Sequence, residues 1–264
     1  MQQRSRDEIV ANLGICYDAV DELMGALAAE NWGVQSLCPE WSVREVVAHL
    51  ASVEQAILGW RPTSADDALP FETIGPWTSE AMAWSNERLV TEARALFAAR
   101  RAELDELDDE QFAVTCPTPV GPATYGRFMD VRVFDFWVHE RDITTPLGRA
   151  TDDGGPAAES ATDEVALSIG YIVGKKIGLP DGMSIAFHLT GPVTRSIYAA
   201  VDGRAGRVDH IDDPSVEVSV DSLTFVQLAC GRIDPQGPIE AGRITWTGDG
   251  EWGERAARNL AFTM

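Results

Sequence analysis

Apolar residues recur at steps of three and four along the first half of the chain, which is the spacing of amphipathic helices. In residues 5–30 the residues in register are Ile9, Leu13, Cys16, Val20, Leu23 and Leu27. The segment Ser42-Val43-Arg44-Glu45 predicts a capping box, with serine at the N-cap and glutamate at N3. The helix that it opens carries an inward stripe of Val46, His49, Leu50, Val53 and Ile57. We therefore expect two helices here, with His49 facing inward.

Three further helical segments are expected, each bounded by proline or glycine. The third runs from about Thr78 or Ser79 to Glu106, after a loop over 61–77. The fourth spans roughly 125–145 and the fifth roughly 157–177.

The pattern changes after Pro180, where β-branched residues begin to alternate with polar ones. Strands are predicted at 184–191, 196–202, 216–222 and 243–249. A short helix capped by Asp221 or Ser222 and a closing helix in EWGERAARNLAFTM complete the chain. Helices followed by a mixed segment predict an α+β protein of two domains, a helical domain over 1–155 and an α+β domain over 156–264, with the boundary between 150 and 180.

Charge and composition narrow the class of partner. The net charge of −21 repels phosphate backbones, so nucleic-acid binding is not expected. The chain has no apolar run of 18 residues and its N-terminal segment lacks an apolar signal region, so we expect a cytoplasmic protein that does not bind membranes. None of Cys16, Cys38, Cys116 and Cys230 forms a C-x-x-C pair, and we expect reduced thiols in or near the core.

The main candidate site lies on the fourth helical segment, in VRVFDFWVHERDI. Asp135, His139 and Asp142 are four and three residues apart, so they share one helix face. If His49 lies alongside, two imidazoles and a carboxylate converge, which is a divalent-metal ligand set with open positions. Zinc is our first choice of metal, and nickel, iron or manganese would also suit these donors.

Other interpretations of these residues stay open. A histidine on an apolar helix face, such as His49, is often a core residue with its hydrogen bonds satisfied. The carboxylate of Asp135 could instead be neutralised by Arg132 or Arg141. Asp142 is a candidate catalytic group, either as an acceptor for an imidazole N–H or as a fourth ligand.

Arg232 follows the short helix that ends near Ala229. We consider it a candidate catalytic and cofactor-binding residue, because a cation there could reach an anionic ligand. The alternative is a cation that only stabilises the end of the helix.

Two motifs resemble a known family. PEWSVREVVAHLASVE looks like the second-helix motif of the DinB-like superfamily, and VRVFDFWVHERDITTPLG looks like the fourth-helix motif of actinobacterial mycothiol-dependent maleylpyruvate isomerases. The tail, with LACGRID and TWTGDGEWGERAARNL, is similar to that family's C-terminal domain. The resemblance covers almost the whole chain.

The resemblance implies an up-and-down four-helix bundle that holds a divalent metal, usually zinc, followed by a small α+β domain like that of sterol carrier proteins. It also implies a thiol cofactor, mycothiol, whose sulfur is activated by the metal. His49, Asp135 and His139 fall on the family's ligand positions. The better-defined isomerases carry glutamate where Asp135 stands, so this chain has a carboxylate that is one methylene shorter.

Three functions follow as expectations. The first is a metal- and mycothiol-dependent isomerase or S-transferase, a monomer or homodimer, whose partners are a small electrophile and a low-molecular-weight thiol. The second is a metal-dependent hydrolase in which Asp142 or Glu140 handles the proton. The third is a non-catalytic protein that binds a small apolar molecule.

Overall fold

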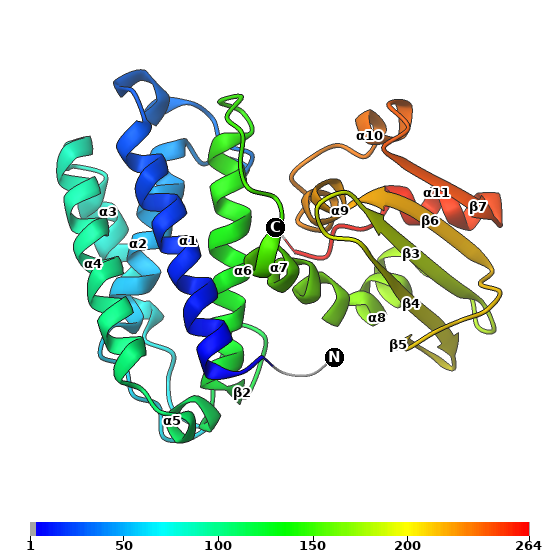
Figure 1. The fold of residues 1–264 in the computed structure, drawn as a ribbon, viewed down its shortest axis with the longest axis horizontal. Coiled ribbons are helices and arrows are strands. Elements are labelled where there is room, and N and C mark those ends of the chain that lie inside the picture. Colours follow the sequence, from blue (N-terminus) through cyan, green and yellow to red (C-terminus); the bar gives the residue numbers. More distant parts are fainter. Residues whose placement is uncertain (1–3, 264) are drawn as a thin grey trace. The chain divides into compact units, whose positions relative to one another are not determined.

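The computed structural model describes residues 4–263 of the chain (Figure 1). They divide into two compact units, one ending at Thr151 and the other beginning at Asp152. None of the helices in this described part is both long enough and apolar enough to cross a membrane.

The first unit is built around four long helices: α1 (Arg6–Ala26), α2 (Val43–Ile57), α4 (Asn86–Glu106) and α6 (Tyr125–Thr144). Helix α1 packs against both α4 and α6, and so does α2, so the four helices enclose one core (Figure 1). The connections contain the shorter elements η1 (Ala29–Gly33), η2 (Phe71–Thr73), α3 (Ile74–Ala81), α5 (Asp109–Ala113), β1 (Thr115–Cys116) and β2 (Ala123–Thr124). This unit is a four-helix bundle, as expected.

Side-chain caps set where these helices begin. The Ser42 side chain accepts a hydrogen bond from the backbone N–H of Glu45, and the Glu45 carboxylate accepts one from the backbone N–H of Ser42. The capping box predicted from the sequence is therefore confirmed. Thr124 caps α6 in a similar way, accepting from the backbone N–H of Arg127. These two caps set the first residues of α2 and α6, the helices that carry the candidate metal ligands.

Two helix predictions in this unit need correction. The segment from Thr78 to Glu106 is not one helix, because α3 ends at Ala81 and Ser85 caps a new helix by accepting from the backbone N–H of Arg88. The expected loop over 61–77 gives way at Phe71 to η2 and α3. Local side-chain capping prevailed over the continuous apolar spacing on which the longer helix was predicted.

The second unit contains a five-stranded sheet in the order β5-β4-β3-β6-β7. The strands are β3 (Ser184–Thr190), β4 (Arg195–Asp202), β5 (Arg204–Val208), β6 (Val216–Asp221) and β7 (Ile244–Gly248). The central strand β3 pairs antiparallel with β4 and parallel with β6. The helical elements of this unit are α7 (Gly155–Leu167), α8 (Ile169–Tyr171), the π-helical turn η3 (Ile172–Ile177), α9 (Ser222–Ala229), α10 (Gln236–Glu240) and α11 (Gly250–Arg258). The α+β class is confirmed.

Three details of this unit differ from the prediction. Strand β5 was not expected, because its sequence RAGRV lacks apolar alternation; it forms because Gly203, at a φ of +62°, turns the chain back onto β4. The predicted helix over 157–177 is divided into α7, α8 and η3. The closing helix ends at Arg258.

All four cysteines are buried and free, as the sequence predicts.

Candidate metal centre

Helix α2 carries His49 on its second turn, next to the buried Leu50. Its ring is partly buried and lies 5.0 Å, centroid to centroid, from the Trp41 indole that precedes the cap. Trp41 also stacks on His139, at 6.0 Å and an interplanar angle of 29°. One tryptophan therefore covers both imidazoles and restricts their access to water.

Helix α6 supplies the other three polar side chains from one face. Asp135 is partly buried, whereas His139 and Asp142 are buried, with 5% and 1% of their surface exposed. The rings of His49 and His139 are 4.9 Å apart. The structure therefore brings together the residues that the sequence proposed from two separate helices. We call His49, Asp135, His139 and Asp142 the ligand cluster.

The spacing of the donor atoms can be tested against a metal ion. Asp135 Oδ2 lies 3.5 Å from His49 Nε2, and Asp135 Oδ1 lies 3.4 Å from His139 Nε2. These two distances are to different oxygens of Asp135; one nitrogen of each histidine and one oxygen of Asp135 all lie within 4.8 Å of one another. Tetrahedral coordination with bonds of about 2.1 Å requires ligand atoms about 3.4 Å apart. The residues present therefore fit a divalent metal with an open position.

Asp142 lies behind His139 and not beside the other donor atoms. Its Oδ2 is 2.8 Å from His139 Nδ1. A carboxylate there accepts the Nδ1 proton, so in the neutral ring the lone pair is on Nε2, on the side of His49 and Asp135. Of the two roles considered for Asp142, this geometry favours the acceptor over the fourth ligand.

Cys38 is a residue that the sequence analysis did not select. It is buried, and its Sγ forms a second group of possible ligand atoms with His139 and Asp142, all within 4.8 Å of one another. The backbone N–H of the preceding Leu37 donates to Asp142 O at 2.9 Å, which holds this loop against α6. In the sequence, Cys38 is distinguished only by its position three residues before Trp41. It lies outside the helical segments, so helical spacing could not place it near His139.

Burial and neighbouring charges shift the pKa values of the cluster in different directions. Burial opposes protonation of His139, but the Asp135 and Asp142 carboxylates outweigh it and raise the pKa of His139 to about 9. For His49 burial dominates and lowers the pKa. Burial also opposes ionisation of Asp135, yet Arg132 and His139 hold the pKa of that carboxyl well below its usual range. Asp135 is therefore ionised, and of the two imidazoles His139 holds a proton more strongly than His49.

The alternative partner of Asp135 is also present. Arg132 Nη1 donates to Asp135 Oδ2, while Arg132 Nε donates to Glu54 Oε1 at 2.9 Å. Arg141 pairs with Glu140 and stacks over Trp137 instead. Asp135 is thus shared, with one oxygen toward Arg132 and His49 and the other toward His139. The ion pair and the histidine contacts coexist.

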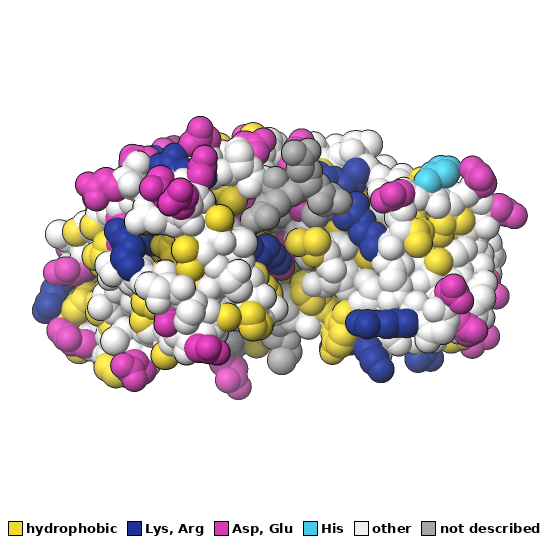
Figure 2. Space-filling view, turned by 90° about the horizontal axis from the view of Figure 1, so that it is seen from below, with side chains coloured by type: hydrophobic (Ala, Val, Ile, Leu, Met, Phe, Trp, Pro, Cys, Tyr) yellow, Lys and Arg dark blue, Asp and Glu magenta, His cyan; other side chains and the backbone are white. Residues whose placement is uncertain are grey.

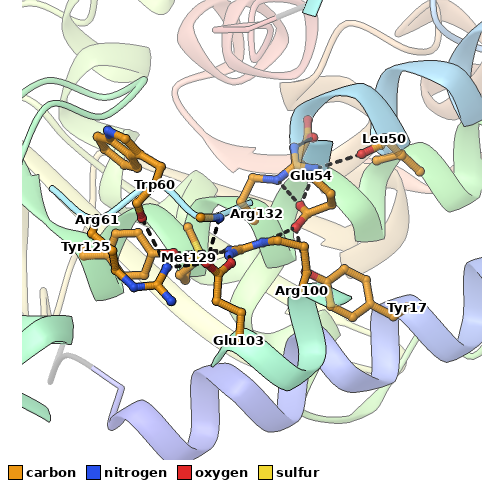
Figure 3. Close-up of polar contacts among 12 residues, drawn as sticks. Tyr17, Leu50, Glu54, Trp60, Arg61, Arg100, Glu103, Tyr125, Met129 and Arg132 are labelled. Carbon is orange, nitrogen blue, oxygen red and sulfur yellow. Dashed lines mark hydrogen bonds and ion pairs between the residues drawn. The ribbon is translucent and has the colours of Figure 1, made fainter. Parts of the chain in front are cut away.

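Behind Arg132 lies a second buried group of polar side chains, drawn in Figure 3. Glu54 accepts from Arg100 Nε at 2.9 Å and from Tyr17 OH at 2.8 Å, and Arg100 also pairs with Glu103. We call Tyr17, Glu54, Arg100, Glu103 and Arg132 the arginine cluster. The sequence analysis missed this cluster, because residues that are hydrogen-bonded to each other in it are separated by 3 to 78 positions in the sequence.

Arg232 belongs to the second unit, in the turn after α9. Its backbone N–H donates to Gln227 O at 2.8 Å, and its Nη1 donates to Cys230 O at 3.0 Å. Both contacts are with the end of the helix, which is the alternative that the sequence analysis gave for it.

Family models match both units. The model described as mycothiol maleylpyruvate isomerase N-terminal domain matches residues 13–144, and the MDMPI C-terminal domain, from the same family, matches residues 159–255. A search of curated protein sequences found no match.

Solved structures with a similar fold were also found. A crystal structure of mycothiol-dependent maleylpyruvate isomerase is 16% identical, with a TM-score of 0.65 over 94% of this chain and 96% of that one. A histidine-to-alanine mutant of that enzyme is 15% identical, with a TM-score of 0.63 over the same shares. Apo sterol carrier protein 2 from Yarrowia lipolytica is 16% identical over 40% of this chain and 94% of its own, with a TM-score of only 0.30.

Proposed function

The chain belongs to the mycothiol-dependent maleylpyruvate isomerase family, and on that premise we propose that it is a metal- and mycothiol-dependent isomerase or S-transferase acting on a small electrophile. The observation that carries the proposal is the convergence of His49, Asp135 and His139 at the separations a metal needs. A bound divalent metal would supply Lewis acidity, which lowers the pKa of a coordinated thiol so that it is nucleophilic at neutral pH.

Each residue then has a defined task. The Nε2 atoms of His49 and His139 and one oxygen of Asp135 would hold the metal, with zinc as the first choice. Asp142 accepts the Nδ1 proton of His139, which would leave Nε2 as the atom that binds the metal. Arg132 engages the other oxygen of Asp135, so the short aspartate is held at one position.

The hydrolase alternative has less support in the geometry. It requires a carboxylate to handle a proton at the metal-bound water. Asp142 contacts His139 Nδ1 on the far side of the ring, and Glu140 pairs with Arg141. Asp142 is therefore engaged away from the side of His139 on which the ligand atoms converge, and Glu140 is engaged by Arg141.

The first test measures metal content by elemental mass spectrometry. We expect near-stoichiometric divalent metal in the purified protein and its loss in His139→Ala. The matched control is His210→Ala, because His210 is an exposed histidine of the second unit. A wild-type protein that takes up no metal on reconstitution would refute the metal centre.

The second test measures chemistry with mycothiol over a panel of activated alkenes, following both geometric isomers and thiol conjugates. We expect turnover that needs both thiol and metal and is absent in His139→Ala. Equal turnover without thiol would point to the hydrolase. Retained binding of an apolar ligand by His139→Ala, with no turnover by either protein, would favour the non-catalytic binding protein.

A further inference from the structure

The second unit contains a groove that the proposed function does not use. It has a volume of about 710 Å³ and lies between the α8–η3 segment and the β4–β5 hairpin. Small-molecule sites in proteins range from about 300 to 1,000 Å³, so this groove is large enough for a metabolite. It is formed by residues of the second unit alone.

Cations and apolar side chains line the groove together. Lys175, Arg204 and Arg207 contribute the charge, and Leu167 and Tyr171 contribute exposed apolar surface. No Asp or Glu is among its lining residues, in a chain that has 42 acidic residues and a net charge of −21. Figure 2 shows dark blue side chains gathered beside yellow ones on this unit.

Two of the three cations that line the groove, Lys175 and Arg204, have no hydrogen-bond or ion-pair partner within residues 4–263. Among the described residues, the basic side chains without a hydrogen bond or ion pair are Lys175, Lys176 and Arg204. Elsewhere the arginines pair with carboxylates or donate to oxygen atoms, as Arg195 does to Asp163 and Arg243 does to Thr224. Cations left without a counterion in a strongly acidic protein favour an anionic ligand.

Glycines bring the walls of the groove close together. A Cβ at Gly174 would lie 2.9 Å from Ala205 Cβ, and one at Gly170 would lie 3.1 Å from Ala205 O. A side chain at Gly174 would therefore force η3 away from β5, and one at Gly170 would be a tight fit against β5.

We propose that this groove is a binding site for a small organic anion that carries a carboxylate or phosphate beside an apolar portion. Lys175 and Arg204 would contact the anionic group, and Leu167 and Tyr171 would cover the apolar portion. The site is independent of the metal centre and of the thiol chemistry.

The test titrates the full-length protein with 8-anilinonaphthalene-1-sulfonate, a fluorescent anion with an apolar ring system. We expect Lys175→Gln and Arg204→Gln each to weaken binding roughly three- to tenfold, in proportion to one partly exposed charged contact. Leu167→Ala removes apolar cover while keeping both charges, and we expect it to weaken this binding about three- to tenfold. Arg258→Gln removes an exposed cation of the same unit and should bind like the wild type. Equal affinity in all these proteins, or an equal loss in the control, would overturn the proposal.

A second measurement uses the fact that Lys175 and Lys176 are the only lysines in the chain. Acetylation by an N-hydroxysuccinimide ester, read by peptide mass spectrometry, then reports on the groove. We expect decanoate to protect Lys175, which lines the groove, more than Lys176, which does not. Inorganic phosphate at the same concentration should protect less. No protection by decanoate, or equal protection by phosphate, would contradict a ligand of mixed character.

Discussion

The arginine cluster and the ligand cluster lie next to each other in the helical unit. They differ in whether their atoms can still bind a ligand. In the arginine cluster, both oxygens of Glu54 accept from guanidinium groups, those of Arg100 and Arg132. Guanidinium groups have no lone pair to offer, so this cluster is complete without a ligand. In the ligand cluster, the Nε2 atoms of His49 and His139 both face the Asp135 carboxylate. The arginine of this site, Arg132, contacts Asp135 and not the histidines.

This difference shows that burial and proximity of charged groups do not by themselves make a metal site. Both clusters are largely buried, and they share Asp135 through its pair with Arg132. What separates them is the chemistry of the nitrogen atoms, because a neutral imidazole offers a lone pair that can bind a metal ion and a guanidinium does not.

Glu54→Gln should have the largest effect on folding. It leaves Arg100 and Arg132 buried with one fewer carboxylate, and removing one partner of a buried ion pair costs about 3–5 kcal/mol. Urea denaturation should show this loss in the free energy of unfolding. Glu22→Gln, at an exposed position of α1, is the control. A loss below about 1 kcal/mol would mean that the arginine cluster contributes little to stability.

Asp135→Asn removes the charge that both clusters share. We expect metal binding to fall more than about a hundredfold and stability to fall by about 1–3 kcal/mol, because the buried Arg132 loses a charged, partly buried partner. Calorimetric metal titration and urea denaturation measure the two effects separately. A variant that loses stability but keeps metal affinity would assign Asp135 to the arginine cluster alone.

Asp142→Asn should act on the ligand cluster without disturbing the other. Loss of the carboxylate behind His139 Nδ1 should weaken metal binding about 10- to 100-fold, which is typical when a ligand loses its hydrogen-bonded support. Competition with a chromophoric chelator measures this change. Unchanged affinity would show that the His139 tautomer does not depend on Asp142.

Cys38→Ala should have the smallest effect on the metal. Cys38 groups with His139 and Asp142, and not with His49 and Asp135, so we expect metal affinity to change roughly threefold or less, under about 1 kcal/mol. The same chelator competition applies. A loss of tenfold or more would place the thiol in the ligand set and reassign the coordination.

The sequence determined the parts of this protein that depend on neighbouring residues. Ser42 and Glu45 fixed the start of α2, and the spacing of Asp135, His139 and Asp142 fixed their common face of α6. The α+β order of the elements followed from the change of period after Pro180. These features depend on the geometry of one helix or one strand, which is the same wherever that element packs.

Only the tertiary structure decided which faces meet. The height of α2 against α6 brought His49 within 3.5 Å of Asp135, and the same packing joined Glu54 to both Arg100 and Arg132. Cys38 behind His139 and the groove beside β5 also come from contacts between segments far apart in the sequence. Residue spacing gives the direction of a side chain on its own element, whereas the register between elements depends on how all the core side chains fill their shared space.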